Sequence, residues 1–239
     1  MRKFPVIIPA YNEAEGIAEL LRELRREVPE ALPVVVNDGS ADATARVAAA
    51  EGAVVLDLPC NLGVGGAVQT GFKYAVERGF DLVVRIDGDG QHPPAEIRKL
   101  LGKMEESGAD AVIGSRYLDG GKNKVRGATA TRDAGNIALA LFLSLICRCR
   151  VTDPSSGFWC VRGKLLRHFA RHYPCEYPEP EAIAMLRRQG CSLAEAPIVA
   201  RPRMRGVSTI KTSGVLYYAL RVALALCADR LRPRLAAGN

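Results

Sequence analysis

The sequence lacks the long apolar stretches that mark membrane proteins and secreted precursors. No window contains the about 20 apolar residues that a helix needs to cross a bilayer, so we expect no membrane-spanning segment. The short apolar run that follows Lys3 is interrupted by Pro5 and Pro9, so we expect no signal peptide.

Two further absences concern cysteine and glycine patterns. The seven cysteines form no C-x-x-C pair, and the nearest approach is the C-R-C of Cys147 and Cys149. We therefore expect reduced, structural thiols inside the cell. The sequence also has no G-x-x-x-x-G-K-[ST] loop, and the cluster of Gly63, Gly65 and Gly66 follows the third expected strand instead of the first. Neither a P-loop ATPase nor a Rossmann dehydrogenase is predicted.

What the sequence does have is an excess of positive charge in a chain of globular composition. Its 239 residues include 33 Lys and Arg against 26 Asp and Glu, a net charge of +7, and 48% are hydrophobic. A basic balance suits an anionic partner such as a nucleotide, a phosphate or a membrane surface. Aromatic and basic residues do not interleave, so we expect no nucleic acid partner. The length fits one large domain, which we place at residues 1–205, with an appendage at 206–239.

The first half of the chain alternates between short strands and amphipathic helices. Runs rich in Val and Ile predict strands at residues 6–8, 34–36, 54–56, 82–86 and 111–113. Apolar residues at helical spacing predict helices at residues 13–28, 41–51 and 65–78, and a further helix after Pro94. Ser40 is the expected N-cap of the second helix. This alternation predicts an α/β fold whose sheet is parallel and covered by helices on both faces.

Polar or glycine-rich segments follow all five of these strands. They are P-A-Y-N-E at 9–13, N-D-G-S-A-D-A-T at 37–44, N-L-G-V-G-G-A-V-Q-T-G at 61–71, D-G-D-G-Q at 87–91 and G-S-R at 114–116. Ligands of parallel α/β sheets bind beyond the carboxyl ends of the strands. Five such segments at one edge predict a binding site there.

The D-G-D-G-Q segment places two carboxylates two residues apart directly after a buried strand. Like charges that close repel each other, so we expect a cation between Asp87 and Asp89. Such oxygen ligands suit Mg²⁺ or Mn²⁺, which bind one or two carboxylates together with substrate phosphates. Gln91 can add a carbonyl oxygen or orient a water, whereas we assign His92 a local structural role. The alternative interpretation of the segment is a solvated Asp-Gly turn.

Two acidic segments elsewhere allow either a functional or a structural role. Asp38, beyond the second strand, can accept hydrogen bonds from a ribose or a base, or can form the turn that leads to Ser40. Glu179 and Glu181 flank Pro180, and one of them can serve as a general base. Acidic residues in the first turn of a helix also complement the helix dipole, so a structural role for both stays open.

Several arginines are candidates for contacts with phosphate, which the planar guanidinium group binds through two donors. They are Arg116, Arg126, Arg132, Arg201, Arg203 and Arg205. Arg205 is the strongest of them because it stands beside Gly206 in a segment able to close over a diphosphate. The alternative for each arginine is a surface position that serves solubility.

Together these segments resemble the motifs of family 2 glycosyltransferases, in the order in which that family has them. The resemblance rests on P-A-Y-N-E, N-D-G-S-x-D-x-T, N-x-G-x-G-x-A, D-x-D-x-Q-H-P-P, G-S-R, D-P-x-S-G-F and R-x-x-G-x-S, and it covers roughly Phe4 to Lys211. The chain is similar to dolichyl- and polyprenyl-phosphate sugar synthases and to bacterial cell-surface polysaccharide glycosyltransferases. The resemblance implies the GT-A fold, a Rossmann-like, mostly parallel sheet flanked by helices, with residues 1–205 as the catalytic domain.

The resemblance also implies an inverting transfer of a sugar from a nucleotide-diphosphate sugar, with Mg²⁺ or Mn²⁺ as the cation. By position in the family's motifs, we assign nucleotide-sugar binding to Pro9, Tyr11, Glu13, Asp38, Asn61, Gly63, Asp87, Gly88 and Arg205. We assign the metal to Asp87, Asp89 and Gln91, the acceptor side to Arg116 and Arg132, and catalysis to Glu181, Glu179 and Asp89.

The acceptor stays open between a polyprenyl phosphate and a lipid-linked glycan, in the synthesis of cell-envelope polysaccharide or glycolipid. A phosphate acceptor is already an anion, whereas a sugar hydroxyl needs a base such as Glu179 or Glu181. The chain departs from the family at Asn37, where a first Asp is usual, and at Val64, where a Lys is common in polyprenyl-phosphate synthases.

Two other functions fit the sequence less well. A sugar nucleotidyltransferase would need a glycine-rich loop with Arg or Lys after the first strand, and P-A-Y-N-E has neither. A non-catalytic nucleotide-sugar binding protein would not need five polar strand ends and a D-x-D-x-Q segment.

Two apolar runs, at residues 137–147 and 215–228, are too short to span a bilayer and are followed by arginines. Apolar helices with Arg beyond their end can lie in a membrane interface, while core burial or a homodimer contact is the alternative. With the basic net charge, we expect peripheral association at the cytoplasmic, inner face of the plasma membrane.

Overall fold

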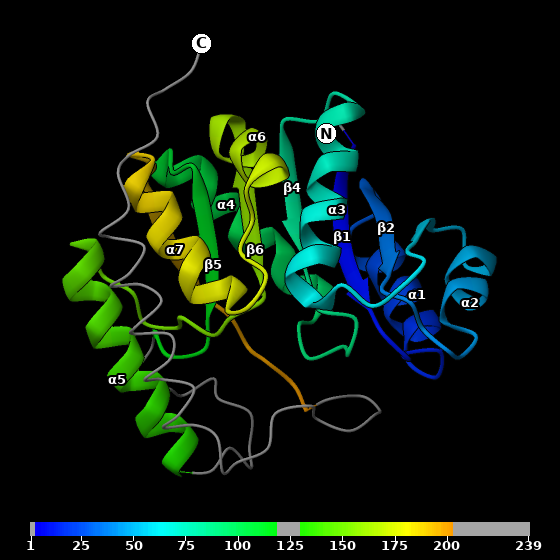
Figure 1. Cartoon of the computed structure of the whole chain (residues 1–239), viewed down its shortest axis with the longest axis horizontal. Helices are drawn as coiled ribbons and strands as arrows, with labels where there is room; N and C mark the ends of the chain where they lie inside the picture. Colours follow the sequence, from blue (N-terminus) through cyan, green and yellow to red (C-terminus); the bar gives the residue numbers. More distant parts are fainter. Residues whose placement is uncertain (1–2, 119–129, 203–239) are drawn as a thin grey trace.

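The computed structural model describes residues 3–118 and 130–202, and the side chains of residues 3–118 and 133–202. In this range the chain forms a seven-stranded sheet with helices on both faces (Figure 1). The strands are β1 (Phe4–Ala10), β2 (Ala31–Asn37), β3 (Val54–Asp57), β4 (Leu82–Arg85), β5 (Ala111–Ser115), β6 (Trp159–Arg162) and β7 (Leu193–Pro197). The helices are α1 (Ile17–Glu27), α2 (Thr44–Ala50), α3 (Gly63–Glu77), the 3₁₀ turn η1 (Pro94–Glu96), α4 (Ile97–Ser107), α5 (Ala130–Cys147), α6 (Gly163–Arg171) and α7 (Pro178–Arg188).

The sheet has the order β3-β2-β1-β4-β6-β5-β7. β1 lies between β2 and β4, runs parallel to both, and is buried along its whole length. β6 runs antiparallel to both of its neighbours, β4 and β5, so the sheet is mostly but not entirely parallel. Neither β6 nor β7 is predicted from the sequence, because neither contains a run of Val and Ile and neither shows a clear polar and apolar alternation.

Alternate residues of β1 point to opposite faces of the sheet and contribute to two separate core layers. Ile7 packs with Phe72 and Trp159 in the layer that α3, α5, α6 and α7 cover. Val6 and Ile8 pack in the other layer, under α1, α2 and α4. Because both faces are buried, the strands appear in the sequence as continuous Val and Ile runs.

The prediction that Ser40 caps a helix beginning at residue 41 is wrong. The Ser40 hydroxyl accepts the N–H of Asn12 at 2.9 Å, from the loop that follows β1. α2 begins at Thr44, and the N–H of Thr44 donates to the Asp42 carboxylate at 2.9 Å. The start of the helix is therefore stabilised by Asp42, because Ser40 is used to join two strand-end loops.

α5 contains the first of the two apolar runs found in the sequence. Among the helices within residues 3–118 and 130–202, none is long and apolar enough to cross a membrane. The second run, at residues 215–228, lies outside the described residues, as does the predicted appendage at 206–239.

Six of the seven cysteines lie in the described residues, and all six are free. Cys160 is buried, and burial raises the pKa of its thiol to about 12. Cys60 and Cys175 are exposed. These free thiols agree with the expectation of a reduced set.

Gly71 is the point at which α3 approaches β1. A Cβ atom at this position would overlap the side chain of Ile7. Gly71→Ala therefore overpacks the core and should lower the free energy of unfolding by about 1–3 kcal/mol, measured by urea denaturation.

The matched control is Gly102→Ala in α4, where a Cβ atom meets nothing within 4 Å. There the same change should raise the stability by up to about 1 kcal/mol, because Ala has a higher helix propensity than Gly. Equal effects at the two positions would contradict a packing role for Gly71.

Candidate active site

The carboxyl ends of β1, β2 and β4 lie side by side at one edge of the sheet, which faces downward in Figure 1. The N–H of Asp38 donates to the carbonyl of Ala10 at 2.9 Å and joins the end of β2 to that of β1. A Cβ atom on Gly88 would lie 2.8 Å from the carbonyl oxygen of Pro9, so glycine is needed for the D-G-D segment to approach β1 this closely. The structure brings these three strand ends together, as predicted.

Hydrogen bonds to the loop after β2 hold the backbone that follows β1. The N–H groups of Glu13 and Ala14 donate to the side chains of Thr44 and Asp42, at 2.9 and 3.1 Å. α1 begins at Ile17 and not at Glu13 as predicted, and the residues between them form the turn that these hydrogen bonds hold.

The P-A-Y-N-E segment turns sharply at Asn12, whose φ of 54° lies in the left-handed region. The side chain of Asn12 accepts the N–H of Ala41 at 2.9 Å, which supports this conformation. Pro9 is buried in the sheet, whereas the Tyr11 side chain is 48% exposed. The turn therefore leaves an aromatic ring at the rim of the site.

Asp38 connects the end of β2 to the glycine-rich start of α3. Its carboxylate is buried and accepts the N–H of Leu62 at 2.7 Å. A Cβ atom on Gly39 would lie 2.7 Å from the backbone nitrogen of Asn61, so the two loops are in close contact. The side chain of Asn61 accepts the N–H of Gly63 at 3.0 Å. Asp38, Asn61 and Gly63 thus lie together, as the motif assignment requires.

Asn37, the departure from the family pattern, has a structural explanation. Its side-chain nitrogen donates to Asp57 on the neighbouring strand β3 at 2.6 Å. An Asp at this buried position would place two carboxylates against each other, which costs free energy unless one is protonated.

The D-G-D-G-Q segment leaves β4 in a tight turn. The Asp89 carboxylate accepts the N–H of Gln91 at 2.9 Å, and the N–H of Asp87 donates to Nδ1 of His92 at 3.3 Å. His92 is buried and packs on Phe158, with ring centroids 5.2 Å apart. These contacts agree with the structural role assigned to His92, while both carboxylates remain partly exposed.

Arg85, the last residue of β4, is a site residue that the sequence analysis misses. Its guanidinium group is buried and donates through Nη2 to Glu179 at 2.7 Å and to Asp87 at 3.2 Å. Nη1 donates to the Tyr173 hydroxyl at 3.2 Å. Burial acts to lower the pKa of Arg85, but Glu179, Tyr173 and Asp87 outweigh it and raise the pKa. A signal for this residue exists in the sequence, since a charge inside an apolar strand is costly unless it is paired.

The charges around Asp87 decide its protonation state. Burial acts to raise the pKa of Asp87, but the Arg85 guanidinium group outweighs it and holds the pKa below its usual range. For His92, burial is the largest cause and lowers the pKa, so the ring is neutral and its Nδ1 can accept a hydrogen bond. Asp87 therefore presents a carboxylate anion to the site.

Arg116, predicted to face the acceptor, already has a partner within the chain. Nε and Nη2 donate to the two oxygens of the Asp153 carboxylate at 2.7 and 2.8 Å, and Asp153 is fully buried. This pair fixes the loop before β6, in which Gly157 lies against the carboxylate of Asp87 with no space for a Cβ atom. Arg116 thus positions one wall of the site, and its contact with an acceptor stays a prediction.

Glu195, on β7, holds the loop before β6 through hydrogen bonds. Its carboxylate accepts the N–H of Thr152 at 2.8 Å and that of Asp153 at 3.2 Å, and it also accepts the Thr152 hydroxyl at 2.9 Å. The Thr152 and Ser115 hydroxyls are 2.6 Å apart. Burial raises the pKa of Glu195 even though these donors act in the opposite direction.

Arg201 supports the D-G-D-G-Q turn from the other side. Its guanidinium group donates to Glu23 of α1 at 2.6 and 3.1 Å and to the carbonyl of Gly90 at 2.5 Å. Its N–H donates to the carbonyl of Gln91 at 3.1 Å. Arg201, which follows β7 in the chain, therefore connects α1 to the D-G-D-G-Q turn.

The remaining predicted residues are placed only in part. Glu181 stands in the first turn of α7, two residues after Glu179, and is half-buried. Arg132 belongs to α5, but its side chain is outside the described part. Arg126, Arg203 and Arg205 lie outside the described residues.

The donor set at the end of β4 fits a hard divalent cation. Within the residues that the structure describes, no three His, Cys, Asp or Glu side chains come together as a metal-ligand group. Asp87 and Asp89 offer two carboxylates that are partly exposed at the sheet edge. Mg²⁺ and similar cations bind one or two carboxylates and take their other ligands from substrate phosphates and water.

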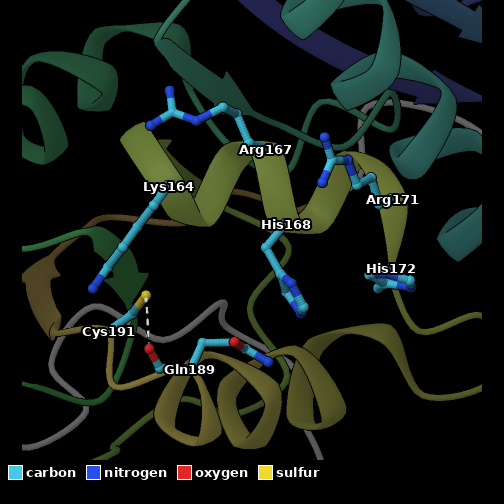
Figure 2. A pocket seen from close by; sticks show the side chains of 7 residues that line it. All are labelled: Lys164, Arg167, His168, Arg171, His172, Gln189 and Cys191. Carbon is cyan, nitrogen blue, oxygen red and sulfur yellow. Dashed lines mark hydrogen bonds between the residues drawn. The ribbon is translucent and has the colours of Figure 1, made fainter. Parts of the chain in front are cut away.

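A cavity of about 350 Å³ lies apart from this edge, between α6 and the end of α7. It is lined by Lys164, Arg167, His168, Arg171, His172, Gln189 and Cys191. In Figure 2, Lys164 and His168 extend toward Gln189, whereas the guanidinium groups of Arg167 and Arg171 are turned to the other side of α6. Its lining has no carboxylate and its cations do not converge, so we place the candidate active site at the strand ends.

The raised pKa of Glu195 predicts a pH-dependent stability. The folded chain holds the proton on this carboxyl to higher pH than the unfolded chain does, so the stabilisation is complete below the ordinary pKa. It is lost as the pH rises through the raised pKa. Between about pH 4 and about pH 8, the free energy of unfolding of wild type should therefore fall relative to that of Glu195→Gln as the pH rises.

The matched control for that series is Glu106→Gln, at a carboxyl that is 71% exposed on α4. It measures how much of the pH dependence comes from removal of a surface charge. A Glu195→Gln curve that runs parallel to wild type at every pH would contradict the raised pKa.

Comparison with known proteins relates this chain to sugar transferases. A family model described as Glycosyl transferase family 2 matches residues 6–167. An undecaprenyl-phosphate mannosyltransferase of Micrococcus luteus is 37% identical over 166 residues, which cover 67% of this chain and 67% of that protein. A polyprenol monophosphomannose synthase of Mycolicibacterium smegmatis is 29% identical over 227 residues, 91% of this chain and 84% of that protein.

Among solved structures, glucosyl-3-phosphoglycerate synthase from Mycobacterium tuberculosis, in complex with Mn²⁺, UDP and glucosyl-3-phosphoglycerate, matches with a TM-score of 0.70. The match covers 95% of this chain and 80% of that one at 22% identity, and it confirms the predicted GT-A fold. The family model spans more than half of the chain and confirms the resemblance that the motifs indicate. The chain belongs to glycosyl transferase family 2.

Proposed function

We propose that the chain transfers a sugar from a nucleotide-diphosphate sugar to a polyprenyl phosphate, with inversion at the anomeric carbon and Mg²⁺ or Mn²⁺ as cofactor. The observation that carries the proposal is the pair Asp87 and Asp89 at the end of β4, on a turn that Gly88 brings against the end of β1 and that Arg85 connects to Glu179 of α7. Relatives named undecaprenyl-phosphate mannosyltransferase and polyprenol monophosphomannose synthase support this acceptor.

The loops after β1 and β2 form the proposed nucleoside site. The exposed ring of Tyr11 is available for the base, with Pro9 and Glu13 on either side of it in the chain. Asp38 lies beside the glycine-rich turn that begins α3. The start of that helix, at Gly63, carries the positive end of the helix dipole, which suits a diphosphate.

Asp87 and Asp89, with Gln91, are the proposed ligands of the cation. A divalent cation held by these residues would neutralise the diphosphate and would stabilise the departing nucleotide. Asp87 is ionised and therefore ready to serve as a ligand. Gly88 allows the turn to lie against β1, and we assign closure over the donor phosphates to Arg205.

The acceptor is inferred from the state of the two glutamates. Glu179 is paired with the buried guanidinium of Arg85, so its carboxylate already has a hydrogen-bond donor within the chain. A phosphate oxygen is already anionic and needs no base to attack the anomeric carbon. Glu181 remains the candidate base for the alternative acceptor, a lipid-linked glycan. Arg116 and Arg132 are the proposed cations on the acceptor side.

α5 offers the proposed membrane contact. Its apolar residues Ile137, Leu141 and Leu145 recur every four residues and are 48%, 68% and 78% exposed. Arg148 and Arg150 follow the helix and are exposed. An apolar stripe with adjacent arginines suits the surface of an anionic membrane, where a polyprenyl phosphate is held. We place the chain at the cytoplasmic face, with a homodimer contact as the alternative role of the stripe.

Asp89→Ala tests the cation and donor site. The change removes a proposed metal ligand from a solvent-accessible turn, so the fold should persist while turnover falls by about 10²-fold or more. The measurement is the formation of glycosylated polyprenyl phosphate from a panel of nucleotide sugars with Mn²⁺. The control is Asp81→Ala, at an exposed carboxylate just before β4 that pairs with Arg167. Full activity of Asp89→Ala would contradict the proposal.

Glu181→Gln separates the two acceptors. Transfer to polyprenyl phosphate should stay within about threefold of wild type, because no base is needed for a phosphate oxygen. If the enzyme glycosylates a lipid-linked glycan instead, the same change should abolish most of the transfer. If the wild-type enzyme forms product only with the glycan, the glycan replaces polyprenyl phosphate as the proposed acceptor.

A further inference from the structure

Arg85 places a buried positive charge between the D-x-D pair and the start of α7. Its side chain is 1% exposed, and a single nitrogen, Nη2, donates to both Asp87 and Glu179. We propose that Arg85 is a positioning residue that acts as a fixed internal cation of the donor site. This inference rests on the proposed function, and it extends it to how the charge of the carboxylates around the site is balanced.

Two of the carboxylates near the turn contact the same donor atom. Arg85 Nη2 donates to both Asp87 and Glu179, and Asp89 is two residues from Asp87 on the same turn. Asp87 and Glu179 repel each other unless positive charge lies between them. Arg85 compensates one of the three negative charges, so two remain. One divalent cation neutralises those two.

The geometry of Arg85 indicates that its position serves more than stability. Its Nε is buried and has no hydrogen-bond partner among the described residues. An unpaired buried donor is unfavourable, and such exceptions call for an explanation. Here the orientation is set by Glu179, Asp87 and the Tyr173 hydroxyl, which together take both terminal nitrogens. The contacts of the terminal nitrogens, and not a contact of Nε, therefore fix the position of the side chain.

The contact also connects two segments that are far apart in the chain. Arg85 ends β4, while Glu179 begins α7, 94 residues later. Fixing Glu179 fixes the first turn of α7, which also carries Glu181. Arg85 therefore determines how the proposed acceptor side lies relative to the D-x-D turn.

The test measures Mn²⁺ binding to the full chain by electron paramagnetic resonance of free Mn²⁺, with and without UDP and without an acceptor. Arg85→Met removes the positive charge at similar length and should tighten Mn²⁺ binding by about tenfold. Glu179→Gln removes a negative charge and should weaken it by a similar factor. The double variant removes both charges and should return to within about threefold of wild type.

Arg85→Lys is the conservative variant, and thermal denaturation checks the fold of each protein. Lys keeps the charge but not the two-armed contact, so Mn²⁺ affinity should stay near the wild-type value while transfer falls. A purely structural role would weaken Mn²⁺ binding in Arg85→Met and Arg85→Lys alike, with no recovery in the double variant, and that result would overturn the inference. If Arg85→Met does not fold, unchanged Mn²⁺ affinity in Glu179→Gln overturns it equally.

The same measurement separates this inference from the proposed function. Wild type that binds no Mn²⁺ under either condition would contradict the cation-dependent transferase and, with it, the role of Arg85. Wild type that binds Mn²⁺ with the same affinity as all variants would leave the transferase intact and remove only the inference about Arg85.

Discussion

Carboxylates can gather at the edge of a buried sheet only where positive charge or hydrogen-bond donors compensate them, and this electrostatic constraint organises the strand ends of this chain. Arg116 compensates Asp153, and Arg85 compensates both Asp87 and Glu179. The contacts of Arg116 with Asp153 and of Arg85 with Glu179 join segments that are distant in the sequence. The rim of the site is therefore held by charge compensation, on a sheet that hydrophobic packing makes rigid.

The first five strands are predictable because both faces of the sheet are buried. Such strands are continuous Val and Ile runs, and each is followed by a segment with a recognisable polar motif. β6 and β7 carry neither signal, since they are short and mix polar with apolar residues. The error at Ser40 has a similar origin. A hydroxyl near a helix start predicts a cap, but the sequence does not reveal that Asn12 binds it first.

The site was predictable to the extent that its residues belong to motifs. Asp38 and Asp87 lie where the strand-end argument places them, and His92 has the structural role expected of it. Arg85 was missed because its meaning depends on Glu179, which no local pattern connects to β4. Membership in glycosyl transferase family 2 indicates the class of reaction.

The reversed direction of β6 has a consequence for how the two substrates are divided along the chain. The loops that follow β1, β2 and β4 lie at the site. Because β6 runs in the opposite direction, the loop at the site is the one that precedes β6 and connects it to α5. The proposed donor side thus belongs to the first half of the chain, and the loop before β6 and the start of α7 belong to the second. Under this proposal, a change of acceptor during evolution can be confined to the segment after β5, without altering the strand-helix units of the first half.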